Sequence, residues 1–240
     1  MHLSLVEYLV VLVAGGVGAA VQGALGFGAN LIAVPVVAIV VPEALPATLV
    51  LWVVPLVIAM AIRERHGVDW SGVRWTTLGR IPGTVLGAWV ASTVASQTLS
   101  VLCGVGVLLA VATSLATADV PLVPATKTAA GFASGAMGTA TSIGGPPLAL
   151  LYQRQDGRVL RSTLAMAFTI GTATSLTGLT LAGAVEPWHV GLALALTPGL
   201  AGGLACSGAL ARRLDGALLR PAVLALATIA ALVAVVRGLA

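Results

Sequence analysis

Apolar residues dominate the chain in long runs separated by short polar stretches. A bilayer core of ~30 Å requires about 20 predominantly apolar residues in each helix that crosses it. Six stretches meet this requirement and predict transmembrane helices, at 45–62, 75–95, 99–118, 164–185, 190–211 and 218–236. The pattern therefore predicts an all-α polytopic membrane protein.

Two further apolar regions, 3–41 and 127–152, are each interrupted by a glycine-rich motif. The arms that follow the motifs, 31–41 and 148–152, are too short to cross a bilayer alone. Each region is therefore predicted to contain a helix, an unwound or tightly turned stretch, and a short second helix. The two arms form either a re-entrant hairpin or two unequal crossings.

The composition agrees with a membrane protein. Hydrophobic residues make up 58% of the 240 positions and charged residues 8%, whereas soluble domains are about 25% charged. The basic residues are scattered over loops, so the net charge of +4 does not indicate a nucleic-acid partner. Cys103 and Cys206 lie in apolar segments, where a thiol behaves as a small hydrophobe, and neither a disulfide nor a metal site is expected.

The first glycine-rich motif returns later in the chain. Gly-Ala-Leu-Gly at 23–26 reappears as Gly-Ala-Met-Gly at 135–138, an offset of 112 residues that also carries Asn30 onto Ser142. The same offset relates Pro35 to Pro147. Paired interruptions in two halves of an apolar protein are typical of the binding sites of transporters.

A second echo supports an internal duplication rather than a chance match of small residues. Pro-Gly-x-x-x-Gly at 82–87 matches the same pattern at 198–203, at an offset of 116 residues. We predict a first repeat over 1–118, a connector over 119–126 and a second repeat over 127–240 in one membrane domain. Each repeat has one split helix pair and three full transmembrane helices.

The Lys and Arg residues predict the orientation, because cytoplasmic loops carry an excess of them. With the loop after 45–62 inside, all 12 basic residues except Arg237 fall on the cytoplasmic side. This result requires each split region to make zero or two crossings. Both termini are then extracytoplasmic, and the halves are inverted-topology repeats, as in many secondary transporters.

The glycine-rich motifs also hold the best candidate binding residues. Broken helices at membrane depth occur where they are buried in protein or line a wet cavity. A helix N-terminus presents unpaired N–H groups that suit an anion, so two such ends near the midplane predict an oxyanion site without a fixed cation. The predicted binding residues of the motifs are Gln22, Gly26, Gly28, Asn30, Thr139, Thr141, Ser142, Gly144 and Gly145.

Close helix packing is the alternative function of these small residues. For Gly23 and Gly135 taken singly, packing explains the sequence equally well. For Asn30 with Ser142 the binding interpretation is favoured, because polar side chains in membrane segments are energetically costly and usually have a function.

Arg80 completes the predicted binding residues. It lies one or two turns inside the predicted helix 75–95, where it either faces a cavity and attracts anions or snorkels to the interface, the commoner behaviour. The eight Asp and Glu residues all fall near predicted helix ends or loops, so no intramembrane carboxylate indicates proton coupling.

In these motifs the chain resembles the sulfite exporter TauE/SafE family of transmembrane proteins. The resemblance rests on the motifs at 23–35, 135–147, 82–87 and 198–203 and spans nearly the whole chain. It implies plasma-membrane transport of small sulfur-containing anions such as sulfite or sulfoacetate, without implying which. Phe27 and Ala29 stand where more glycines are expected, so the first motif is expected to be less open than the second.

Other functions are less well supported. His2, His66 and His189 lie near helix ends, and the sequence has neither an H-E-x-x-H motif nor a P-loop, so no enzyme activity or cofactor is expected. A passive anion channel would use the same helix dipoles, and a membrane subunit of a larger complex is a third interpretation. The expected partners are a small anion and the lipid bilayer, and the small chain allows a homodimer.

Overall fold

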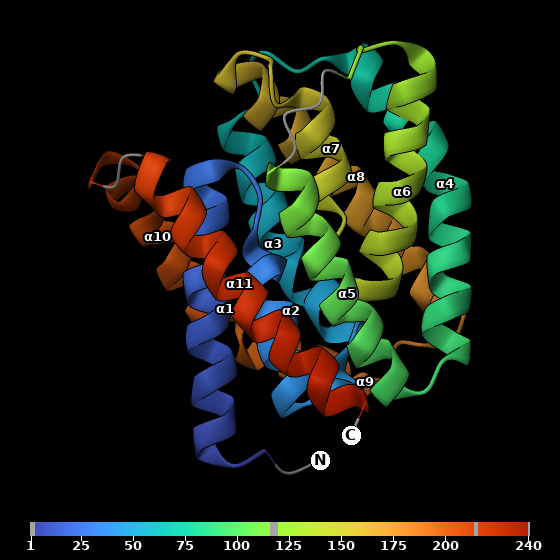
Figure 1. The fold of residues 1–240 in the computed structure, drawn as a ribbon, viewed down its shortest axis with the longest axis vertical. Coiled ribbons are helices and arrows are strands. Elements are labelled where there is room, and N and C mark those ends of the chain that lie inside the picture. Colours follow the sequence, from blue (N-terminus) through green and yellow to red (C-terminus); the bar gives the residue numbers. More distant parts are fainter. Residues whose placement is uncertain (1–2, 116–119, 214–215, 240) are drawn as a thin grey trace.

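The computed structural model describes residues 3–115, 120–213 and 216–239, which form helices without any strand (Figure 1). This confirms the prediction of an all-helical protein. The helices are α1 (Leu5–Leu25), α2 (Ala29–Val40), η1 (Pro42–Ala44), α3 (Ala47–Arg63), α4 (Trp70–Thr93), α5 (Ser96–Leu115), α6 (Pro124–Thr141), α7 (Gly145–Tyr152), α8 (Gly157–Leu181), α9 (Pro187–Ala195), α10 (Thr197–Arg213) and α11 (Gly216–Leu239).

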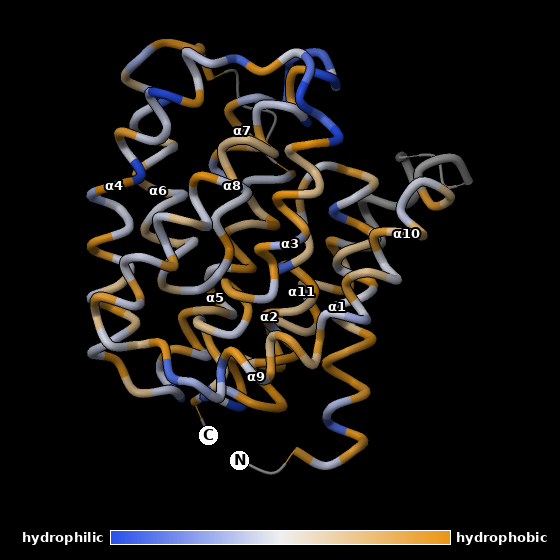
Figure 2. Tube along the Cα trace, turned by 180° about the vertical axis from the view of Figure 1, so that it is seen from behind, coloured by the Kyte–Doolittle hydropathy of each residue, from blue (hydrophilic) through white to orange (hydrophobic). Residues whose placement is uncertain are grey.

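The outside of the helix bundle is largely apolar. Hydrophilic positions gather at the two ends of the molecule (Figure 2), while large side chains such as Val13, Val85 and Ile229 are exposed between them. Extended apolar surface of this kind marks contact with a membrane. Helix α1 begins and α11 ends at one end of the bundle, and the α3–α4 and α7–α8 connections lie at the other (Figure 1).

Fewer helices than the predicted six are unambiguous membrane spans. Among the described residues, α1, α5 and α8 are each long and apolar enough to cross, and α9 with α10 makes a fourth candidate. Helix α3 has 17 residues, and α4 has 24 but contains Arg74, Arg80 and many Gly and Thr residues. The polar positions of α4 include buried ones that face other helices, which is why its sequence is less apolar than that of a lipid-surrounded span.

The prediction of an unbroken helix over 190–211 is wrong, because α9 and α10 meet at an angle of 42°. Pro198 follows the bend; its nitrogen has no hydrogen, and its ring would clash with a carbonyl one turn earlier in a continuous helix. Side chains of two other helices donate hydrogen bonds to the backbone carbonyls at the bend. The Tyr8 hydroxyl donates to Ala195 O at 2.8 Å, and Trp52 Nε1 donates to Leu196 O at 3.2 Å.

Glycines let two pairs of helices approach backbone to backbone. A Cβ added at Gly83 in α4 or at Gly131 in α6 would collide with the backbone of the facing helix, and one added at Gly199 or Gly203 in α10 would collide with the backbone of α1. The α4–α6 and α1–α10 pairs lie on opposite flanks of the molecule, with α3 and α8 between them (Figure 1). Close glycine packing thus holds the long arm of each split region in place.

The two Pro-Gly motifs do not pack in equivalent positions. Gly87 faces Ala136 and Thr139 near the end of α6, whereas Gly203 faces Gly16 in the middle of α1. When α1 and α6 are aligned by the 112-residue offset of the glycine-rich motifs, Gly16 lies about two helical turns before the α1 position that corresponds to Ala136. The repeated Pro-Gly-x-x-x-Gly motif therefore does not make equivalent packing contacts in the two halves of the chain.

Candidate functional site

The predicted interruptions are present, between α1 and α2 and between α6 and α7. In the first, Gly26 has φ 94° and Gly28 has φ 116°, values that favour glycine. In the second, Ser142 has φ 62° and Gly144 an ordinary φ of −95°. The first motif therefore has two residues in the left-handed region and the second has one, Ser142.

The two breaks are joined by a direct hydrogen bond. Asn30 Nδ2 donates to the backbone oxygen of Ser142 at 2.7 Å, and Ser142 Oγ donates to Pro46 O at 3.0 Å. Because a carbonyl can only accept, this bond also fixes which end of the Asn30 amide faces Ser142. Residues 112 positions apart in the sequence thus meet at the centre of the molecule.

The helix N-termini at the breaks offer fewer free donors than the sequence analysis expected. The N–H of Ala29, at the start of α2, donates to Gln22 Oε1 at 3.1 Å. Helix α7 has only eight residues, and Pro146 and Pro147 in its first turn have no N–H. Positive potential for an anion must therefore come mainly from another source.

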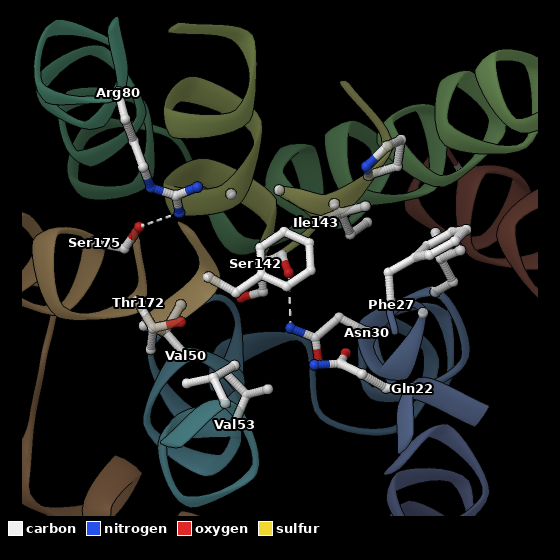
Figure 3. Close-up of a pocket in the computed structure, with 18 residues that line it drawn as sticks. Gln22, Phe27, Asn30, Val50, Val53, Arg80, Ser142, Ile143, Thr172 and Ser175 are labelled. Carbon is white, nitrogen blue, oxygen red and sulfur yellow. Dashed lines mark hydrogen bonds between the residues drawn. The ribbon is translucent and has the colours of Figure 1, made fainter. Parts of the chain in front are cut away.

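A cavity of about 70 Å³ lies where the breaks meet α3, α4 and α8 (Figure 3). About 10–15 Å³ of such volume holds one water molecule, so the cavity suits a small polyatomic ion. Predicted binding residues that line it are Gln22, Gly28, Asn30, Arg80, Ser142, Gly144 and Gly145.

Arg80 supplies a fixed positive charge to this cavity. The residue is only 6% exposed, and its guanidinium points toward Ser175 among the residues that line the cavity (Figure 3). Nη1 donates to Ser134 Oγ at 2.7 Å and Nη2 to Ser175 Oγ at 3.2 Å, while Nε has no partner. The snorkelling interpretation does not fit this position, nor does the expectation of a site without a fixed cation.

In the described part of the chain no carboxylate neutralises Arg80. Its two partners are serine hydroxyls, and no Asp or Glu lines the cavity. A buried, unpaired charge is costly unless something compensates it. The site is therefore built to attract a negative charge.

Ser134 connects Arg80 to the second break. Its hydroxyl accepts from Arg80 Nη1 and donates to Gly144 O at 2.6 Å. Gly144 also lacks space for a side chain, since an added Cβ would lie 2.9 Å from Ser134 O. The guanidinium and the α6–α7 break are thus held in one fixed arrangement.

Three predicted binding residues do not line the cavity. Gly26 faces Arg161. Thr141 Oγ1 donates to Met137 O in its own helix at 2.7 Å. Thr139 Oγ1 shares a 2.8 Å hydrogen bond with Ser175 Oγ. It therefore contacts a partner of Arg80 and does not face the cavity.

Several residues that line the cavity were not predicted from the sequence. Thr172 and Ser175 are three positions apart in the apolar helix α8, and this shared polar face was the signal that could have found them. Phe27 and Phe168 add aromatic walls, and an added Cβ at Gly145 would lie 3.5 Å from Phe168 and 3.7 Å from Phe27. No pattern in the sequence places Phe168 opposite the first break.

A second polar cluster ties helices together away from the cavity. Asp69, which caps α4, accepts from Lys127 Nζ and from the Tyr152 hydroxyl, each at 2.8 Å. Burial raises the pKa of Asp69, but the hydrogen bonds from Lys127, the Gly72 N–H and Tyr152 outweigh it, so the pKa lies below its usual value. The cluster joins the first turns of α4 and α6 to the last turn of α7.

Comparison with known protein families identifies the chain. The family described as sulfite exporter TauE/SafE matches residues 10–234, which include both breaks and Arg80. The chain belongs to the sulfite exporter TauE/SafE family. Membership makes it a membrane transport protein for sulfite-type anions, as the resemblance implied. Comparison with curated proteins and with solved structures gave no match.

Proposed function

We propose that this TauE/SafE protein is a secondary transporter that carries small oxyanions, sulfite or short organosulfur anions, across the plasma membrane. The anion binds in the central cavity between the two breaks. Arg80 provides the charge, and Gln22, Asn30 and Ser142 contribute polar groups around it.

The observation that carries this proposal is the buried Arg80 guanidinium, which has no carboxylate partner among the residues that the structure describes. A guanidinium has five N–H donors, and the two hydrogen bonds to Ser134 and Ser175 use two of them. The remaining donors suit the oxygens of an oxyanion, because planar guanidinium groups bind such oxygens two at a time. The small cavity limits the size of the anion that reaches them.

The packing of the helices supports the proposal of two inverted repeats, over 1–118 and 127–240. Helix α1 packs on α10 as α6 packs on α4, and α2 packs on α11 as α7 packs on α5. Asn30 meets Ser142, and Thr169 Oγ1 donates to Val57 O at 3.0 Å; both pairs are 112 residues apart. Equivalent residues meet in this way next to a two-fold axis.

The basic residues support an orientation with both termini outside the cell. The α3–α4 and α7–α8 connections, which carry Arg65 and Arg154, lie at the end of the bundle opposite the start of α1 (Figure 1). An excess of such residues marks the cytoplasmic side.

Transport of sulfite by the purified protein in liposomes, with the membrane potential clamped at several values, tests the proposal. A carrier gives a flux that saturates with sulfite concentration and is reduced by competing sulfonates. A flux that rises linearly with concentration would show a passive anion channel instead. No flux of any sulfur anion would contradict the proposed substrate class and leave a membrane subunit of a larger complex as the better interpretation.

A further inference from the structure

The positive charge of Arg80 in the cavity bears on how the transport of one anion is coupled to the movement of another. We infer that this protein is an anion exchanger, which changes its access from one side of the membrane to the other efficiently only with an anion in the cavity. The inference rests on the proposed function, because it concerns the same site. It adds a second substrate, a small oxyanion that moves in the opposite direction.

No carboxylate in the part of the chain that the structure describes neutralises Arg80. Serine hydroxyls accept from Nη1 and Nη2, Nε has no partner, and none of the described carboxylates lies at the cavity. Removing one partner from a buried ion pair is strongly unfavourable because the other charge stays unpaired. With an anion bound, Arg80 belongs to such a pair; without it, the cation remains uncompensated.

Arg80 also cannot escape this condition by moving or by losing its proton. The guanidinium lies against Gly171 of α8 and Gly138 of α6, where even a Cβ would collide with it or crowd it. Ser134 and Ser175 hold its two terminal nitrogens. An arginine does not deprotonate in proteins, so the charge persists through the whole transport cycle.

Any carrier must return its site to the starting side after releasing an anion. A return without an anion moves α4, α6 and α8 around an unpaired buried cation, whereas a return with an anion moves them around a neutral pair. The second path has the lower barrier. Because only a small cavity surrounds Arg80, the returning anion must be another small oxyanion and cannot be a larger metabolite.

Sulfite uptake into liposomes distinguishes exchange from one-way transport. One set of liposomes contains unlabelled sulfite and the other contains only a buffer of large organic ions; both receive labelled sulfite outside. We expect uptake into the preloaded set to be faster by about tenfold or more, a ratio that needs a barrier difference of only about 1.4 kcal/mol. Equal uptake into both sets would overturn the exchange and leave the proposed function standing. No uptake into either would overturn both.

Arg80→Lys gives an independent test of the cause. A buried lysine changes its pKa readily and can release its proton, which a guanidinium does not. The variant is therefore expected to lower the ratio of uptake into preloaded and anion-free liposomes. The matched control is Arg74→Lys in the same helix, where the side chain is exposed and lies over Trp75; it should keep the wild-type ratio. An unchanged ratio in an active Arg80→Lys protein would contradict the charge argument.

Discussion

Glycine and serine residues around Arg80 determine where its guanidinium lies in the site. Gly138 and Gly171 leave space for the guanidinium between α6 and α8, and Ser134 and Ser175 fix its nitrogens. The four residues come from two helices other than α4, so no local sequence pattern around position 80 reveals the direction of the side chain. The sequence showed an arginine in an apolar helix, and tertiary packing decides that it faces inward.

Gly171→Ala is expected to abolish most transport without preventing insertion into the membrane. The added Cβ would occupy the place of guanidinium atoms, so Arg80 must shift, and a misplacement of about 1 Å in a reacting site can cost about 100-fold in rate. The measurement is sulfite flux per inserted protein in liposomes. Gly202→Ala is the control, because nothing lies within 4 Å of its added Cβ. Wild-type flux in Gly171→Ala would show that the position of Arg80 is unimportant.

At the scale of elements, the two split regions were predictable and the third interruption was not. Glycine-rich motifs inside apolar runs predicted the α1–α2 and α6–α7 breaks, which the structure contains. Pro198 looked equivalent to Pro82, and α4 continues through Pro82 while the chain bends before Pro198. At the bend before Pro198, Tyr8 of α1 and Trp52 of α3 donate to backbone carbonyls, and no local sequence pattern around Pro198 reveals these contacts.

The link between the breaks gives a prediction that separates binding from packing. Asn30→Ala removes the donor to Ser142 O and leaves a buried carbonyl unpaired, at a cost of about 1–3 kcal/mol. Ser142→Ala keeps that carbonyl and its bond, and removes a hydroxyl that donates to Pro46 O, a carbonyl that still accepts from Val50 N. We expect Asn30→Ala to raise the KM for sulfite more than Ser142→Ala does, with both proteins inserted. Parallel losses of folded protein and flux in both variants would support the packing alternative.

The whole molecule combines two glycine-packed flanks with a central cavity that both flanks line. The α1 flank contributes Gln22, and the α4–α6 flank contributes Arg80 and Gly138. The 112-residue offset predicted that Asn30 and Ser142 are equivalent, but their direct contact required the fold. Composition predicted the membrane environment because it is a property of the whole chain. The cavity, in contrast, depends on which faces of the helices pack against one another.

Equilibrium binding of labelled sulfite to the purified protein tests whether Arg80 binds the transported anion. The variants to compare are Arg80→Gln and Arg74→Gln, which remove the same charge from the inside and the outside of one helix. We expect wild-type binding for Arg74→Gln and, for Arg80→Gln, a loss of binding free energy of about 3–5 kcal/mol, enough to abolish measurable binding. Wild-type affinity in a folded Arg80→Gln protein would show that Arg80 does not bind the anion.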